Sequence, residues 1–310
     1  MSSRLCMPLL GAGGYLLRRQ AFRWSATDDG IRPDPQTVQD GLAVYVFGEG
    51  EPLLLMPYPH AATVVGGHAL TKLIEGLEAF GRKVVTFDPP GSGRSTRRMR
   101  LGMSEMLECA EEALGVCEVS KPVDVMGHSQ GGFASLAFAL QLPGRVRRLV
   151  LVAAGAGGPS WLGAQGAIWN SSHPDYWHFG LLSSVYLLTR RLAAQKLMYN
   201  LVFRDSYVER VRFAPSPIPL KDWVLPAHPR TRWALVARNL DYRPRLGEVS
   251  VPTLLLAGRH DPQMPPSCSE ELDRGISKTK LILFEKSGHY PFIEEPETFW
   301  EIVRNFLVGS

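Results

Sequence analysis

The sequence predicts an α/β fold: a mostly parallel central sheet with helices on both faces and a helical segment inserted between two strands. Short β-branched runs alternate with segments that carry the 3.6-residue period of amphipathic helices. Several of the runs are apolar throughout, which is typical of parallel strands that are covered on both faces. The alternation stops near Pro159 and resumes at Val251, which indicates an insertion.

Seven runs are expected to form strands, and two of the segments between them show clear helical faces. The runs are Ala43–Phe47, Leu53–Met56, Lys83–Phe87, Val123–Met126, Arg148–Val152, Thr253–Ala257 and Leu281–Phe284. One helical face consists of Leu70, Leu73, Ile74 and Leu77, and Gly81 ends that helix. A second face, of Phe299, Ile302, Val303 and Phe306, follows Pro296, which suits the first turn of a helix.

The pattern divides the chain into four segments. We expect an N-terminal arm at 1–40, a core at 41–158 and 248–310, and a helical cap at 159–247 over the sheet. The apolar part of the arm, residues 5–17, is too short to span a bilayer, so no stable membrane insertion is expected. Five of the seven tryptophans lie in the cap: Trp161, Trp169, Trp177, Trp223 and Trp233.

Composition narrows the function classes. The 310 residues are 45% hydrophobic and 21% charged, as in an ordinary globular protein, and the net charge of +4 is too small to indicate nucleic-acid binding. Four scattered cysteines form no CxxC pair, which favours a reducing, cytoplasmic compartment and gives no metal framework. We therefore expect a small molecule as the partner.

The most informative segment is Gly127-His-Ser-Gln-Gly131, between an apolar strand and an amphipathic helix. A serine at the apex of such a tight turn brings the residues two before and two after it together, so both must be small. The hydroxyl of Ser129 then stands clear of the sheet at a helix N-terminus, where amides can stabilise negative charge. A GxSxG pattern also occurs by chance, but this strand–helix context predicts a nucleophile. The adjacent His128 is expected to pack under the turn.

A serine nucleophile needs a base, and the base needs a group that fixes its tautomer. Of eight histidines, His289 alone follows the last predicted strand and precedes the terminal helix. Asp261 follows the strand Thr253–Ala257, whereas the loop after Arg148–Val152 holds no carboxylate. Because the carboxyl ends of parallel strands meet at one edge, Ser129, His289 and Asp261 are expected to converge there.

The order Ser129, Asp261, His289 resembles the α/β-hydrolase superfamily over roughly residues 40–310, and within it the capped esterases and proline iminopeptidases. Asp88-Pro-Pro-Gly-Ser-Gly-Arg-Ser95 is similar to the family's DxxGxGxS turn, and Glu294-Glu-Pro296 fits its histidine loop. The resemblance implies the α/β-hydrolase fold and a Ser–His–Asp triad without cofactor or metal. The resemblance gives little indication of which substrate the protein acts on.

One segment departs from the family pattern. The family has His-Gly after its third strand, and the next residue donates a backbone N–H to the oxyanion. Here the sequence reads Met56-Pro-Tyr-Pro-His-Ala-Ala62. If Pro57 and Tyr58 took the His-Gly positions, the donor would be Pro59, which has no N–H. Tyr58 or Ala62 could donate instead, with Tyr58 slightly favoured, and Gln130 is the other expected donor.

Two-step acyl transfer follows from these residues, and the substrate stays open. A carboxylic ester of a small or medium apolar acyl or aryl group is the first expectation, because the cap is rich in aromatic residues. The alternatives are an aminopeptidase resembling proline iminopeptidases, a hydrolase of C–C bonds in acidic ring-fission products, and a binding protein without turnover. Twelve Lys and Arg against five Asp and Glu between Pro159 and Gly247 would suit acidic substrates, or form a solvated face.

Overall fold

The computed structural model describes residues 35–59, 68–98, 102–189, 206, 208 and 236–309. Within these residues eight strands form one sheet in the order β1-β2-β4-β3-β5-β6-β7-β8. β2 is antiparallel to β1 and β4, and every other pair is parallel, which confirms the mostly parallel sheet. The strands are β1 Thr37–Gln39, β2 Leu42–Phe47, β3 Glu51–Met56, β4 Arg82–Phe87, β5 Val123–His128, β6 Val146–Val152, β7 Thr253–Gly258 and β8 Thr279–Phe284.

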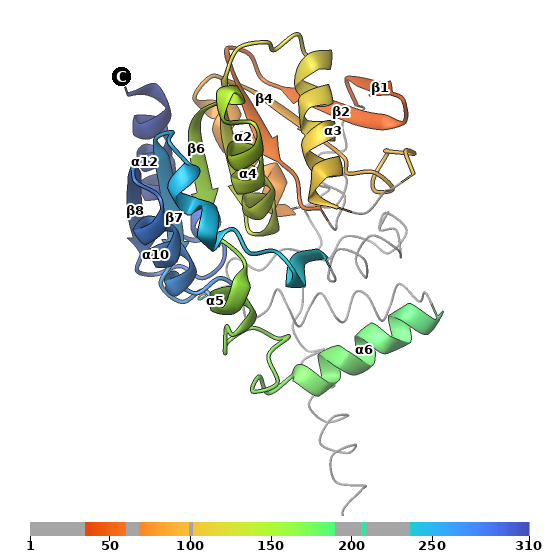
Figure 1. Cartoon of the computed structure of the whole chain (residues 1–310), viewed down its shortest axis with the longest axis vertical. Coiled ribbons are helices and arrows are strands. Elements are labelled where there is room, and N and C mark those ends of the chain that lie inside the picture. Colours follow the sequence, from red (N-terminus) through yellow and green to blue (C-terminus); the bar gives the residue numbers. More distant parts are fainter. Residues whose placement is uncertain are drawn as a thin grey trace, which may run out of the picture.

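Helices cover both faces of the sheet, so the predicted α/β-hydrolase architecture is confirmed (Figure 1). On one face pack α2 His68–Ala79, α11 Pro291–Glu294 and α12 Pro296–Val308. On the other pack α3 Met103–Val116, α4 Gln130–Gln141 and α10 Pro266–Gly275. Short 3-10 helices occupy Pro143–Arg145 and Arg243–Glu248. None of the described helices is long and apolar enough to cross a membrane.

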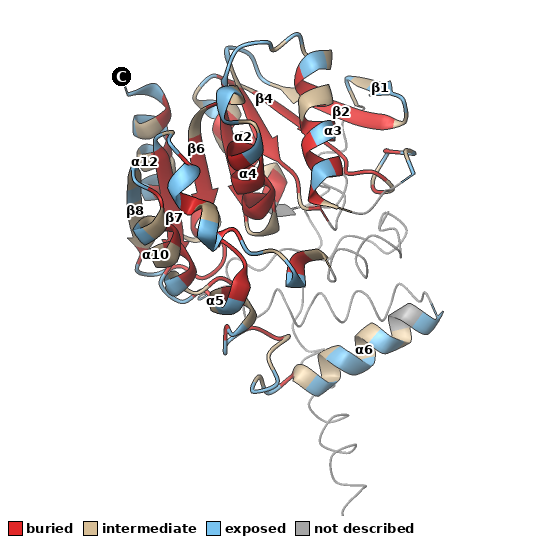
Figure 2. Ribbon diagram, viewed as in Figure 1, coloured by how far each residue is buried: buried red, intermediate tan, exposed pale blue. Residues whose placement is uncertain are grey.

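The described part of the segment predicted to form the cap follows β6. It contains α5 Gly158–Leu162 and α6 Tyr176–Thr189. Figure 1 shows α6 set apart from the sheet, beyond α5. Figure 2 shows inner strands and an α4 that are buried almost throughout, whereas α6 is half-buried or exposed. The core therefore lies between the sheet and its helices.

All seven predicted runs are strands, with ends that extend by one or two residues. Sequence reasoning missed β1, which lies inside the predicted N-terminal arm and pairs with β2. The turn between them consists of Asp40 and Gly41, which both have positive φ, at 46° and 77°. An Asp-Gly pair between two extended segments is a known hairpin signal, so the strand was detectable. The rest of the arm, residues 1–34, lies outside the described residues.

The Asp88 turn after β4 is a buried polar anchor. Asp88 has no solvent exposure, and its carboxylate accepts hydrogen bonds from the Tyr45 hydroxyl at 2.7 Å and from the Arg94 N–H at 2.8 Å. The Ser95 hydroxyl donates to the Asp88 carbonyl oxygen and accepts from the Ala43 N–H. These bonds fix the turn against β2.

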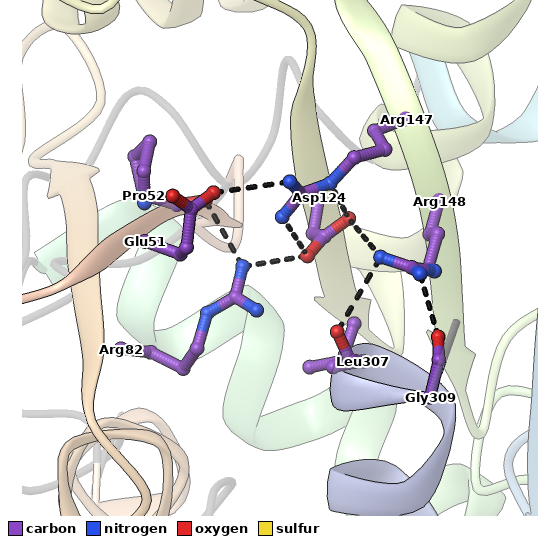
Figure 3. Close-up of polar contacts among 8 residues, drawn as sticks. All are labelled: Glu51, Pro52, Arg82, Asp124, Arg147, Arg148, Leu307 and Gly309. Carbon is purple, nitrogen blue, oxygen red and sulfur yellow. Dashed lines mark hydrogen bonds and ion pairs between the residues drawn. The ribbon is translucent and has the colours of Figure 1, made fainter.

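At the edge of the sheet where the parallel strands begin, one buried carboxylate contacts three arginines (Figure 3). Asp124 is fully buried and accepts from Arg82 at 2.6 Å and from Arg147 at 2.8 and 2.9 Å. Arg148 lies 3.8 Å from the same carboxylate and also donates to the Leu307 and Gly309 carbonyl oxygens at the end of α12. The cluster thus joins β4, β5, β6 and the last helix.

Replacing Asp124 by leucine is expected to destabilise the protein by about 3–5 kcal/mol, because Arg82 is buried and would lose its acid. Urea unfolding measures the change. The matched control is Glu51→Gln, which removes an exposed acid that also pairs with Arg147 and should cost less than about 1 kcal/mol. Equal losses for the two variants would contradict the role assigned to Asp124.

Candidate active site

Ser129 occupies a strained turn between β5 and α4. Its φ of 54° and ψ of −121° are uncommon for a residue with a side chain and are typical of strain held by surrounding structure. A Cβ atom on Gly127 would lie 2.4 Å from the Gly131 carbonyl oxygen, and one on Gly131 would lie 2.6 Å from the Met56 carbonyl oxygen at the end of β3. Neither position admits a side chain. Ser129 itself is partly exposed.

Asp261 and His289 form a buried pair. Asp261 Oδ2 lies 2.7 Å from His289 Nδ1, and the two residues are 4% and 2% exposed. The other carboxylate oxygen, Oδ1, accepts from the backbone N–H groups of Gln263 at 2.8 Å and Met264 at 3.0 Å. Both Asp261 oxygens therefore have partners, and one of them is directed at the ring that it would orient.

The loop that carries His289 contacts the turn that carries Ser129. The rings of His128 and His289 have centroids 4.6 Å apart, and His128 Nε2 lies 2.8 Å from the His289 carbonyl oxygen. Since His128 directly precedes Ser129, the turn of residues 127–131 after β5, here called the elbow, and the loop of His289 after β8, the predicted base loop, meet at the carboxyl edge of the sheet. Asp261, after β7, is bound to the same loop through His289.

His128 is more than a packing residue under the turn, which is what sequence reasoning expected. It is fully buried, accepts a hydrogen bond from the Tyr58 hydroxyl at 2.5 Å and lies against Tyr290 and Phe292. Burial, together with the neighbouring imidazole of His289, holds the pKa of His128 well below its usual value of 6.5. No sequence signal distinguishes this histidine from a packed one.

The low pKa of His128 predicts a pH-dependent stability. Below pH 6.5 the unfolded chain binds a proton at this ring and the folded chain does not, so stability falls as the pH falls. Between about pH 7.5 and about pH 5.5 this group alone should remove about 1.4 kcal/mol. Urea unfolding of the wild type and of His128→Gln at both pH values isolates this contribution, because the variant lacks the ring. Identical losses in the two proteins would contradict the shift.

The two expected oxyanion donors flank the elbow. Gln130 begins α4 directly after Ser129, and Tyr58 lies two residues beyond β3, whose last residue, Met56, comes close to Gly131. The Tyr58 side chain points to the elbow through its bond to His128, and burial raises the pKa of its hydroxyl far above the usual range. The alternative donor, Ala62, lies outside the described residues. The donor assignments stay predictions.

A short piece of the cap is bound to both loops of the pair. The Ser206 carbonyl oxygen accepts from the His289 N–H at 2.7 Å, and the Ser206 hydroxyl accepts from the Gln263 side chain. The Glu294 carboxylate accepts from the N–H groups of Val208 and Gly288, both at 2.7 Å. Sequence reasoning noted Glu294 only as part of the histidine-loop resemblance and had no signal for Ser206 or Gln263.

The cap tryptophans do not share one role. Trp161 is 6% exposed and packs between Phe133 of α4 and Trp169, as part of the core. Trp177 on α6 is 79% exposed. Trp223 and Trp233 lie outside the described residues. The described tryptophans therefore give no single aromatic pocket.

The basic character of the cap lies mostly beyond the described residues. Of its cations, Arg238, Arg243 and Arg245 are described, and two of them have acidic partners. Arg243 binds Asp241 and Arg245 binds Glu248, both at 2.7 Å and at the surface. Exposed pairs of this kind leave little charge to attract a substrate. Among the described residues, no group of three or more His, Cys, Asp or Glu side chains could hold a metal ion.

Comparisons with known proteins identify the family of the chain. Residues 64–302 match the model of the Alpha/beta hydrolase family. The chain is 26% identical to a 2-hydroxy-6-oxononadienedioate/2-hydroxy-6-oxononatrienedioate hydrolase of Klebsiella pneumoniae, over 85% of this chain and 89% of that protein.

Two solved structures are similar at 20% identity. An alpha/beta fold family hydrolase of Bacillus anthracis has a TM-score of 0.71, with 85% of this chain and 94% of that chain covered. An esterase of Exiguobacterium antarcticum has a TM-score of 0.65, with 86% and 96% covered. At this identity they support the fold alone, whereas the family model matches well over half of the sequence. The chain is therefore a hydrolase of the α/β-hydrolase family.

Proposed function

We propose that this protein is a serine hydrolase that cleaves carboxylic esters of small or medium apolar acyl or aryl groups. Ser129 is the nucleophile, His289 the general base and Asp261 the group that orients the base. The observation that carries the proposal is the buried 2.7 Å contact between Asp261 and His289 in a loop that touches the Ser129 elbow. Family membership alone supports hydrolysis but names neither the residues nor the bond.

The mechanism follows from the protonation states that these contacts permit. Asp261 accepts the Nδ1 proton of His289, so Nε2 carries the lone pair that takes the proton of Ser129 as its oxygen attacks the substrate carbonyl. The backbone N–H groups of Gln130 and Tyr58 stabilise the oxyanion. The protonated His289 gives its proton to the leaving alcohol, and an acyl-Ser129 ester remains. Water, deprotonated by His289, releases the acid and restores the serine.

An ester is the bond that this arrangement cleaves with the fewest further requirements. The leaving group needs only one proton, which His289 supplies, and no cofactor enters any step. Aromatic rings pack beside His289, since Tyr290 contacts it and Tyr290 and Phe292 both contact the His128 ring. The structural likeness to an esterase fits this proposal, although at 20% identity it carries the fold and not the substrate.

Hydrolysis of a carbon–carbon bond is the second candidate. It is favoured by the name of the Klebsiella pneumoniae relative, a hydrolase of a 2-hydroxy-6-oxo dicarboxylate, and by the excess of Lys and Arg in the cap sequence. The same nucleophile and base would serve, but the leaving carbon must be stabilised as an enolate and protonated. The substrate carboxylates would also need cationic partners.

A substrate panel decides between the two. The purified protein is assayed with p-nitrophenyl acetate, butyrate and benzoate, and with 2-hydroxy-6-oxo-dienoic acids with and without a second carboxylate. The proposal expects kcat/KM for the best ester to exceed that for every dienoic acid. A preference for the dicarboxylate, lost at high salt, would favour the second candidate. Absence of Ser129-dependent turnover with both classes would overturn the proposed function.

A further inference from the structure

The residue before the nucleophile joins three parts of the site. His128 ends β5, its Nε2 lies 2.8 Å from the carbonyl oxygen of His289, and its Nδ1 is bonded to the hydroxyl of Tyr58. It is fully buried, so water does not compete for either contact. The proposed mechanism uses neither ring nitrogen of this histidine and does not use the Tyr58 side chain.

We propose that Tyr58 and His128 act as a positioning couple, in which Tyr58 fixes the His128 ring and His128 fixes the main chain of His289. This inference rests on the proposed function, because it concerns the placement of the base relative to Ser129. In this inference the elbow not only presents the nucleophile but also holds the main chain of His289 through His128. The position of the base is then set by the residue bonded to the serine itself.

The partners determine the tautomer of His128. A carbonyl oxygen only accepts, so Nε2 must carry the proton and donate it to His289. Nδ1 is then the lone-pair nitrogen and accepts from the Tyr58 hydroxyl. The opposite tautomer would place the Nε2 lone pair against the carbonyl oxygen, so the carbonyl oxygen sets the tautomer, and the Tyr58 hydroxyl, which can donate or accept, donates to Nδ1. The bond to Tyr58 therefore holds the ring at Nδ1, with the Nε2 donor directed at the His289 carbonyl oxygen.

The anchor matters because it binds the main chain of His289 at its carbonyl oxygen, which the bond from Asp261 to the ring does not. Asp261 binds the ring at Nδ1, and Glu294 binds the neighbouring Gly288 N–H, but neither bond reaches the backbone groups of His289 itself. The Ser206 carbonyl oxygen holds the His289 N–H from the cap side, and His128 holds the carbonyl oxygen from the sheet side. With its N–H and its carbonyl oxygen both bound, the backbone of His289 is held in place, and so is the point from which the imidazole extends. A displacement of about 1 Å in such a site can cost about 10²-fold in rate.

Two substitutions of similar polarity separate this role from simple packing. In His128→Gln the side-chain amide nitrogen lies where Nε2 was, so the donor to His289 is kept. In His128→Asn the shorter amide reaches the position of Nδ1 and can meet Tyr58, but no donor reaches His289. Both variants keep a polar side chain at the buried position, and thermal unfolding reports whether each of them folds.

Steady-state kinetics with a p-nitrophenyl ester tests the couple. We expect His128→Asn to lower kcat by about 30–100-fold with KM within about threefold, and His128→Gln to restore kcat to within about fivefold of the wild type. Tyr58→Phe, which removes only the hydroxyl, should lower kcat by about 3–10-fold at unchanged KM. If the Asn variant fails to fold, Tyr58→Phe and the Gln variant still test the inference.

Equal kcat values for the Asn and Gln variants, or a loss that appears in KM alone, would overturn the positioning role. Normal kcat in Tyr58→Phe would remove Tyr58 from it. The Ser129→Ala variant is assayed in parallel, so that failure of the positioning role can be told from failure of the proposed function. An inactive Ser129→Ala beside a fully active His128→Asn refutes only the couple, whereas an active Ser129→Ala refutes the proposed function.

Discussion

Replacement of Ser129 by alanine is expected to lower kcat for ester hydrolysis by at least about 10⁴-fold, with KM changed by less than about threefold. The variant lacks the oxygen that forms the acyl-enzyme, while the elbow and the oxyanion donors stay in place. The strained backbone at φ 54° is no harder for alanine than for serine, so the loss should reflect chemistry and not folding. Initial rates at saturating p-nitrophenyl ester measure it.

Ser135→Ala is the matched control for this variant. Ser135 lies on α4, six residues after Ser129, and is buried, and its hydroxyl donates to the Gly131 carbonyl oxygen four residues earlier in the helix. Its removal takes away one hydrogen bond, worth about 1 kcal/mol of stability, and should leave kcat within a few-fold of the wild type. If both alanine variants were equally active, Ser129 would not be the nucleophile.

Replacement of Asp261 by asparagine is expected to lower kcat by about 10³–10⁴-fold while the protein stays folded. The asparagine oxygen can keep the bonds from the Gln263 and Met264 N–H groups, which hold the acid loop. Its amide nitrogen then faces His289 Nδ1 as a donor. The His289 proton is forced onto Nε2, which can no longer accept the proton of Ser129.

Two measurements separate this tautomer effect from a distorted loop. Thermal unfolding should change little between the wild type and Asp261→Asn, and the rate of inactivation by a fluorophosphonate should fall in parallel with kcat, because both need the same base. Asp261→Ala, which also loses the loop contacts, should be less stable and no more active. An Asp261→Asn variant with more than about a tenth of wild-type kcat would contradict the assigned role.

The fold was largely readable from the sequence because its signals are local. Short apolar runs between helical segments predicted the strands. Gly81 indicated the end of one helix and Pro296 the start of another, and the structure confirms both. The three predicted site residues follow strands whose carboxyl ends share one edge, so topology alone places them near one another. The short strand β1 was missed because three residues with two exposed side chains carry little hydrophobic pattern.

The contacts that surround the site could not be read in the same way. The bonds of His128 to Tyr58 and to His289 join residues 70 and 161 positions apart, and their partners are a hydroxyl and a backbone carbonyl. No periodicity marks such a pair. The sequence pattern likewise does not indicate the hydrogen bond between Ser206 and the Gln263 side chain or the ion pairs of the arginines with Asp124. Buried polar networks depend on the tertiary structure, which sequence spacing does not describe.

The central claim is that Ser129 attacks the substrate with the help of His289, and covalent trapping tests it most directly. The protein is treated with a fluorophosphonate, digested, and its peptides are analysed by mass spectrometry. The account predicts one modified residue, Ser129, and loss of the label in Ser129→Ala and in His289→Ala. A label on another residue, or undiminished labelling of folded His289→Ala, would contradict it.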